Sequence, residues 1–236
     1  MPHRLLPFTR LIDTLAQYFG EPTPPAMTEP FAMILRENIA YLANDAKRAE
    51  AFADLQAGVG LEPADIRKAK DRVLLTIAGK GILPATTVDK LRRAAEIARD
   101  SFGENLALIL DKPLAQAKKE LRKFPGIGEP SAEKILLFNR RFPVLALESN
   151  GLRVLVRLGY APEHKNYSTM YKNMQTRLAA QLPTNCEALI RAHQLLRQHG
   201  QELCKRAAPR CGSCPLRPNC AFFSEIAASA RPFACQ

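Results

Sequence analysis

The sequence has 236 residues, of which 47% are hydrophobic and 24% are charged, and its mean hydropathy is −0.17. Its purely apolar runs, such as 106–110, are far shorter than the ~18 residues that cross a bilayer, so we expect a soluble globular protein with no membrane span rather than a collagenous or disordered chain. The net charge is +11, and because residues 1–117 are neutral overall, the excess lies in 118–236. Such a basic half indicates a face for a polyanion such as nucleic acid, although a basic protein without that partner is the alternative.

Helical periodicity dominates the sequence. Apolar residues recur three or four positions apart between Phe31 and Leu42, which predicts a helix there. The same spacing predicts further helices over residues 66–77, 88–97, 114–124, 131–138, 152–158, 171–182 and 188–197. Proline and glycine clusters separate these segments at 22–25, 58–60, 79–84, 125–126 and 183. No segment alternates convincingly as a strand does, so the sequence predicts an all-α fold of roughly ten short helices.

A compact set of cysteines lies near the C-terminal end, in the pattern C-x6-C-x2-C-x5-C. Its members are Cys204, Cys211, Cys214 and Cys220. Disulfides are disfavoured because nothing marks the chain as secreted. Four thiolates bind either zinc or a [4Fe–4S] cluster, and the single C-x2-C unit favours the cluster only slightly. For Cys186 and Cys235, which lie outside the pattern, we expect a buried apolar role and a tail thiol.

Basic residues accompany these cysteines. Lys205, Arg206 and Arg210 lie between the first two cysteines of the pattern. A loop held in one shape by a metal centre presents such cations well to phosphates, whereas a loop without metal would merely carry solvated charges. The sequence therefore predicts DNA-backbone contacts from these three residues.

A glycine-containing turn joins two of the predicted helices at Phe124-Pro-Gly-Ile-Gly128. Gly126 and Gly128 permit a close approach of another backbone, and the N–H groups that begin the second helix form an anion site. The flanking cations Arg122, Lys123 and Lys134 would add to it. A G-x-G sequence alone is usually only a turn, but in a basic region between two helices it favours a helix–hairpin–helix that binds the DNA backbone.

Taken together, these motifs resemble the endonuclease III superfamily of helix–hairpin–helix DNA glycosylases. The resemblance runs from about Phe31 to Cys220, and its carriers are residues 124–128, 146–154, His199-Gly200 and the four cysteines. It implies two helical domains with a DNA cleft between them. One would be a helical barrel over 29–142 with the helix–hairpin–helix at 114–139, and the other an iron–sulfur domain of 1–28 plus 143–236. The resemblance also implies a [4Fe–4S] cluster on the four cysteines rather than zinc.

Two positions depart from the family pattern. Members that also cleave the DNA strand carry a lysine where this chain has Pro130, and proline has no amine to form a Schiff base. The essential aspartate of the family corresponds to Glu148, which keeps the carboxylate on a longer side chain. The resemblance therefore implies a monofunctional glycosylase, with Glu148 stabilising the positive sugar as the base leaves.

Further residues match positions that approach the base in this family. Glu37 corresponds to an acidic residue that protonates the leaving base, provided that burial raises its pKa. Asn150 resembles the motif of adenine-type members, and Tyr41 is expected to stack on a base. Leu42 and Leu83 are expected near the positions from which the family fills the gap left by an extruded nucleotide.

The resemblance thus predicts a base-excision repair enzyme that hydrolyses the N-glycosidic bond of a damaged or mismatched base in double-stranded DNA. We expect a cytoplasmic monomer, associated with the nucleoid if the source is bacterial. The alternative is a homologue of the same fold that binds damaged DNA and has lost catalysis, which Pro130 and Glu148 both favour. A zinc-bearing structural module is a remote third possibility.

Overall fold

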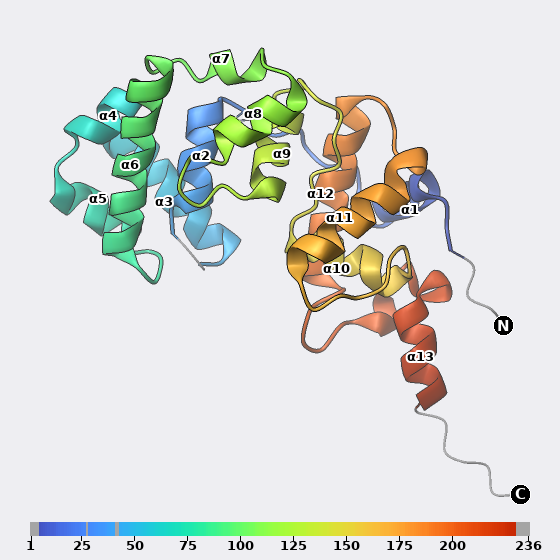
Figure 1. The fold of residues 1–236 in the computed structure, drawn as a ribbon. Coiled ribbons are helices and arrows are strands. Elements are labelled where there is room, and N and C mark those ends of the chain that lie inside the picture. Colours follow the sequence, from blue (N-terminus) through green and yellow to red (C-terminus); the bar gives the residue numbers. More distant parts are fainter. Residues whose placement is uncertain (1–4, 27, 41–42, 230–236) are drawn as a thin grey trace, which may run out of the picture. The chain divides into compact units, whose positions relative to one another are not determined.

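The computed structural model describes residues 5–26, 28–40 and 43–229, and over these ranges it is built from helices alone. Thirteen α-helices and three short 3-10 helices are present, without a strand in the described ranges, which confirms the predicted all-α class (Figure 1). No helix within those ranges has the length and apolar character needed to span a membrane. The chain divides into two compact units, Pro25–Phe142 and Met1–Pro24 with Pro143–Gln236.

The first unit contains eight helices. They are α2 Pro30–Asn38, α3 Asp45–Gly58, α4 Pro63–Lys68, α5 Asp71–Ala78, α6 Pro84–Phe102, α7 Ala107–Leu110, α8 Leu114–Leu121 and α9 Glu129–Phe138. Its core forms around α6, which packs against α2, α4 and α5 (Figure 1). Ala94, Ala95 and Ala98 are fully buried on α6, and their small side chains let the neighbouring helices approach closely.

Helix α2 is almost entirely buried. Glu29 precedes it and accepts a hydrogen bond from the N–H of Ala32, which caps the helix start. Its face of Phe31, Ile34 and Leu35 is buried in the core, as the apolar spacing predicts. The last turn of α2 therefore reaches α9 with a fixed orientation, and that turn carries Glu37.

The second unit contains five α-helices and three short 3-10 helices. They are α1 Phe8–Phe19, α10 Ser149–Leu158, α11 Tyr167–Leu178, α12 Cys186–Glu202 and α13 Ala221–Ser229, with 3-10 turns at Ala179–Gln181, Cys211–Ser213 and Arg217–Asn219. Helix α12 lies at the centre and packs against α10 and α1. Cys186 is buried in its first turn, as expected, whereas Cys235 lies outside the described residues. This unit holds Glu148 and the cysteine loop.

Candidate functional site

The hairpin between α8 and α9 is held in place by a side chain from α2. Gly126 has a φ of +73°, and a Cβ at this position would lie 2.4 Å from Oδ1 of Asn38. Asn38 is 3% exposed, and its Nδ2 donates to the carbonyls of Pro125 at 2.8 Å and Ile34 at 3.0 Å. Asn38 falls on the apolar face that the spacing of residues 31–42 predicts. An amide side chain at such a core position is the sequence feature that points to its role.

Gly128 differs from Gly126 in its surroundings. It precedes α9, whose start has no side-chain cap, and a Cβ on it would touch only Cδ of Pro130 at an ordinary 3.8 Å. No described protein atom therefore requires glycine here on steric grounds. The open position lies beside the first turn of α9, where the N–H groups lack partners within the helix.

The predicted DNA-contacting cations of the hairpin are all ion-paired. Arg122 pairs with Glu129 at 3.2 Å, Lys123 pairs with Glu120 at 2.6 Å, and Lys134 pairs with Glu37. Arg122 and Lys123 remain about half exposed, so they stay accessible to phosphates. Lys134 is largely covered, so its partner is a protein carboxylate.

Glu37 is a partly buried carboxylate with both oxygens engaged. Its Oε1 is paired with Lys134 and its Oε2 accepts a hydrogen bond from the Ser131 hydroxyl at 2.9 Å, while only 18% of the side chain is exposed. Burial is the largest influence and raises the pKa of Glu37, but Lys134, Ser131 and Arg48 together outweigh it and leave the pKa below its ordinary value. The condition for Glu37 to act as an acid, a pKa raised by burial, is therefore not met, because a cation from α9 reaches the carboxylate.

Glu148 occupies the N-cap of α10. Its Oε1 accepts the N–H of Gly151 at 2.8 Å, and its Oε2 accepts Nδ2 of Asn150 at 2.7 Å. A carboxylate at a helix N-terminus is stabilised by the unpaired N–H groups and by the helix dipole. The longer glutamate side chain thus folds back onto its own helix. Asn150, expected at the substrate, is placed here as the partner of Glu148.

Side chains contact three successive backbone carbonyls of the extended segment that leads into Glu148. Gln175 of α11 donates to the carbonyl of Leu145 at 2.5 Å, and Nδ1 of His193 on α12 hydrogen-bonds with that of Ala146 at 2.5 Å. The Tyr167 hydroxyl contacts the carbonyl of Leu147 at 3.5 Å. These contacts give residue 148 a defined position before α10 begins.

Tyr167 is a residue that the sequence analysis missed. Its side chain is 40% exposed, and its ring stacks on Tyr171 with centroids 6.2 Å apart. Burial, with a contribution from the charge of Glu148, raises the pKa of Tyr167 to about 12, so its hydroxyl remains protonated. An exposed aromatic ring is thus held close to the candidate catalytic carboxylate, and its only sequence signal is an aromatic residue directly after the N-cap Asn166.

Hydrogen bonds connect Glu148 to the cysteine loop. Oδ1 of Asn150 accepts from Nη2 of Arg153 at 2.8 Å, and Arg153 also donates to the carbonyls of Gly200 at 2.7 Å and Cys204 at 2.8 Å. A Cβ at position 200 would lie 2.7 Å from Cβ of Asn150, so glycine is needed where α12 passes α10. No sequence motif indicates this role for Arg153.

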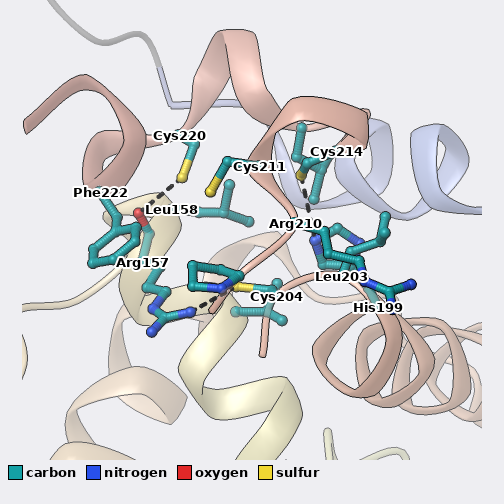
Figure 2. A pocket seen from close by; sticks show the side chains of 13 residues that line it. Arg157, Leu158, His199, Leu203, Cys204, Arg210, Cys211, Cys214, Cys220 and Phe222 are labelled. Atoms are coloured by element: carbon teal, nitrogen blue, oxygen red, sulfur yellow. Dashed lines mark hydrogen bonds between the residues drawn. The ribbon is translucent and has the colours of Figure 1, made fainter. Parts of the chain in front are cut away.

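The four cysteines line one pocket, which Figure 2 shows from close by. About 350 Å³ between the lining atoms, open mouth included, is not filled by protein, and the walls include Val154, Leu158 and Leu216. Two side chains hydrogen-bond to sulfur: Arg157 to Sγ of Cys204 at 3.5 Å, and His199 to Sγ of Cys214 at 3.7 Å. The thiols thus share an apolar pocket with the guanidinium of Arg157 and the imidazole of His199.

The four cysteines supply the thiol donors that both a zinc ion and a [4Fe–4S] cluster take. In the described ranges, no three His, Cys, Asp or Glu side chains lie close enough together to hold one metal ion. Burial raises the pKa of Cys214 to about 11, so this thiol stays protonated unless a metal centre binds it.

Arg157 hydrogen-bonds to the backbone of the loop that carries the cations Lys205 and Arg206. Its guanidinium donates to the carbonyls of Lys205 at 2.7 Å and Arg206 at 3.1 Å, and it stacks on the ring of Phe222 at 4.3 Å. Arg206 and Arg210 are exposed, and Lys205 is half-buried. These contacts hold the backbone of Lys205 and Arg206 against Arg157.

Two expected base-contacting residues, Tyr41 and Leu42, lie outside the described residues. Leu83 is described and lies at the start of α6, where it and Ile82 are exposed by 47% and 59%.

No known family model matches the sequence. The endonuclease III of Sulfolobus acidocaldarius is 27% identical over 199 residues, which cover 82% of each chain. A solved non-covalent complex of endonuclease III with DNA has a TM-score of 0.75 at 19% identity and covers 95% of this chain and 100% of that chain. A thermostable thymine-DNA glycosylase has a TM-score of 0.72 at 14% identity and covers 92% of this chain and 97% of that chain. The chain is thus similar in sequence to an endonuclease III, and its fold is similar to those of endonuclease III and a thymine-DNA glycosylase.

Proposed function

We propose that this protein is a monofunctional DNA glycosylase of base-excision repair. The observation that carries the proposal is the fixed carboxylate of Glu148, whose oxygens are held by Gly151 and Asn150 in a fold shared with endonuclease III. A glycosylase must extrude the target nucleotide from the duplex before it reaches the glycosidic bond. The hairpin and the cations Arg206 and Arg210 would hold the DNA backbone during this step.

In the proposed reaction, Glu148 stabilises the positive charge that develops on the sugar as the base departs. A preorganised carboxylate contributes strongly to such a step because no reorganisation is needed during the reaction. Glu37, which Lys134 and Ser131 hold ionised, contacts the base as a hydrogen-bond acceptor and does not protonate it. Tyr167 presents its exposed ring beside the reacting sugar.

Strand cleavage through a Schiff base is not part of the proposal. Pro130 has no amine, and the ammonium of Lys134, one turn further along α9, is engaged with Glu37. Borohydride should therefore trap no covalent complex with abasic DNA. A trapped complex that Lys134→Met abolishes would show that this lysine acts as the nucleophile, and the monofunctional assignment would fall.

Cys204, Cys211, Cys214 and Cys220 would hold a [4Fe–4S] cluster that stabilises the loop bearing the DNA-contacting cations. When bound, such a cluster would cross-link the loop, and Arg157 and His199 lie within hydrogen-bond distance of the Cys204 and Cys214 sulfurs that would hold it. Purified protein should contain about four irons per chain, and Cys211→Ser should lose them. Stoichiometric zinc without iron would remove the cluster from the proposal.

Release of base from duplex oligonucleotides tests the central claim. Glu148→Gln should abolish release while DNA binding stays intact or tightens, because the shape is kept and a negative charge near the phosphates is lost. The second candidate function is a DNA-binding homologue without catalysis. Pro130 and the longer side chain at Glu148 favour it, and tight binding without release by the wild type would support it.

A further inference from the structure

Glu37 belongs to a cluster that carries more positive than negative charge. Its carboxylate is paired with Lys134 and accepts a hydrogen bond from Ser131, both on α9. Arg48, on α3, is the second cation that favours the ionised form of Glu37. The Nε of Arg48 is buried, and within the described part of the chain it has no hydrogen-bond partner. Two cations thus act on one carboxylate, and one buried donor remains for a ligand.

The ionised Glu37 offers acceptors and has no proton to give. A carboxylate has roughly four lone-pair sites, and the protein takes one on each oxygen through Lys134 and Ser131. An N–H group of a bound base therefore still finds an acceptor there. The cluster combines this acceptor with the donors and the excess positive charge of Lys134 and Arg48.

The chemistry of the departing base then separates possible substrates. A base of the uracil or thymine type leaves as an N1 anion, which nearby positive charge stabilises. An ordinary purine leaves with the help of a proton, and Glu37 holds none. An alkylated purine leaves without a proton, but it is cationic while attached, so two neighbouring cations repel it.

We propose that the base released by this protein is a pyrimidine of the uracil or thymine type, bound through its N–H by Glu37 and stabilised as a departing anion by Lys134 and Arg48. The inference rests on the proposed function, in which the extruded base reaches Glu37. The C1′–N1 bond breaks with its electron pair moving to N1, and water forms the new bond to C1′. The water loses one proton and the base anion takes up one from solvent, which leaves free base and an abasic sugar.

Single-turnover release from a panel of duplexes tests this proposal. The panel contains 5-fluorouracil, uracil and thymine opposite guanine, with adenine, hypoxanthine and 7-methylguanine as purine comparators. The pyrimidines should be released in order of falling N1 acidity, fluorouracil first. Purines should be released at least ~10²-fold more slowly, which is the typical contribution of the missing general acid.

Variants test whether the cations cause this preference. Lys134→Met should slow thymine release by about 10²-fold, the usual effect of removing one donor to a developing anion, and fluorouracil release by less because its anion needs less help. Lys134→Arg should keep most of the rate. Lys80→Met is the matched control, since Lys80 is also an ion-paired lysine of this unit but pairs with Glu50 and Asp54 on α3. If Lys134→Met fails to fold, Arg48→Met carries the same comparison.

The outcomes separate the inference from the function on which it rests. Faster release of adenine or 7-methylguanine than of any pyrimidine would overturn the inference and leave the glycosylase intact. Equal slowing of all pyrimidines by Lys134→Met would also overturn it, because a merely structural role produces no dependence on the leaving group. Tight binding of every duplex without release of any base would remove the proposed function and the inference together.

Discussion

Replacing Arg153 by methionine tests whether the cysteine loop holds Glu148 in position. Methionine keeps much of the apolar stem and removes the guanidinium that bonds to Asn150, Gly200 and Cys204. The amide of Asn150 then loses its support, and two carbonyls lose their donors. Glu148 would keep its N-cap bond to Gly151 but lose the rigid partner on its other oxygen.

The size of the effect follows from the number and setting of these bonds. A hydrogen bond to a charged group contributes about 1.5–3 kcal/mol net. Arg153 makes three, but it is only half-buried, so water screens and partly replaces them. We therefore expect a loss of about 3 kcal/mol in the free energy of unfolding, which corresponds to a Tm lower by roughly 6–12 °C at this chain length.

Arg191→Met is the matched control for this experiment. Arg191 also makes three hydrogen bonds in the same unit, but its partners Asp13 and Glu21 are exposed carboxylates. Ion pairs with such exposed carboxylates are screened by water and contribute little, so this variant should melt within a few degrees of the wild type. Calorimetry and single-turnover base release measure both variants. If Arg153→Met melts together with the control and releases base at the wild-type rate, the proposed link from the cysteine loop to Glu148 is refuted.

Three further predictions concern the hairpin, Glu37 and the cysteine loop. Asn38→Leu should lower the free energy of unfolding by about 1–3 kcal/mol in urea titrations, because it leaves the Pro125 carbonyl buried without its donor; an unchanged midpoint would contradict this. Since the folded pKa of Glu37 is below its ordinary 4.5, its ionisation stabilises the fold above about pH 4.5, and the stability advantage over Glu37→Gln should shrink as the pH falls through the folded pKa. A stability advantage of the wild type over Glu37→Gln that grows as the pH falls would contradict this prediction. Arg206→Glu with Arg210→Glu should weaken binding to all duplexes alike and reduce the salt slope by about 2, and a slope equal to that of the wild type would show that these cations do not contact phosphates.

Local features of the fold were predictable from the sequence. The hairpin follows from proline and glycine between two apolar repeats, and the structure begins α9 at Glu129, directly after Gly128. The capping of α10 by Glu148 is also local, because donor and acceptor lie three residues apart. Helix α1 was not predicted, although Phe8, Leu11 and Leu15 carry the required spacing.

Long-range contacts decided the features that the sequence did not predict. The helix predicted over 66–77 is broken into α4 and α5, where the carbonyls of Ile66 and Ala69 accept hydrogen bonds from Arg92 of α6. The ionisation of Glu37 depends on Lys134, which lies 97 residues away in the chain. Periodicity reports which face of a helix is buried, but it carries no information about which cation a buried carboxylate meets.

The two glycines of the hairpin differ in whether the protein itself excludes a side chain from their position. Gly126 is required by the protein itself, since both its backbone conformation and the amide of Asn38 exclude a side chain. A Cβ at Gly128 would meet only Cδ of Pro130, at an ordinary 3.8 Å, so sterics within the described chain do not require glycine there. Gly126→Ala should therefore destabilise the folded protein, whereas Gly128→Ala should leave its stability unchanged. Under the proposed function, Gly128→Ala should leave the fold and the position of Glu148 unchanged and weaken the binding of duplex DNA.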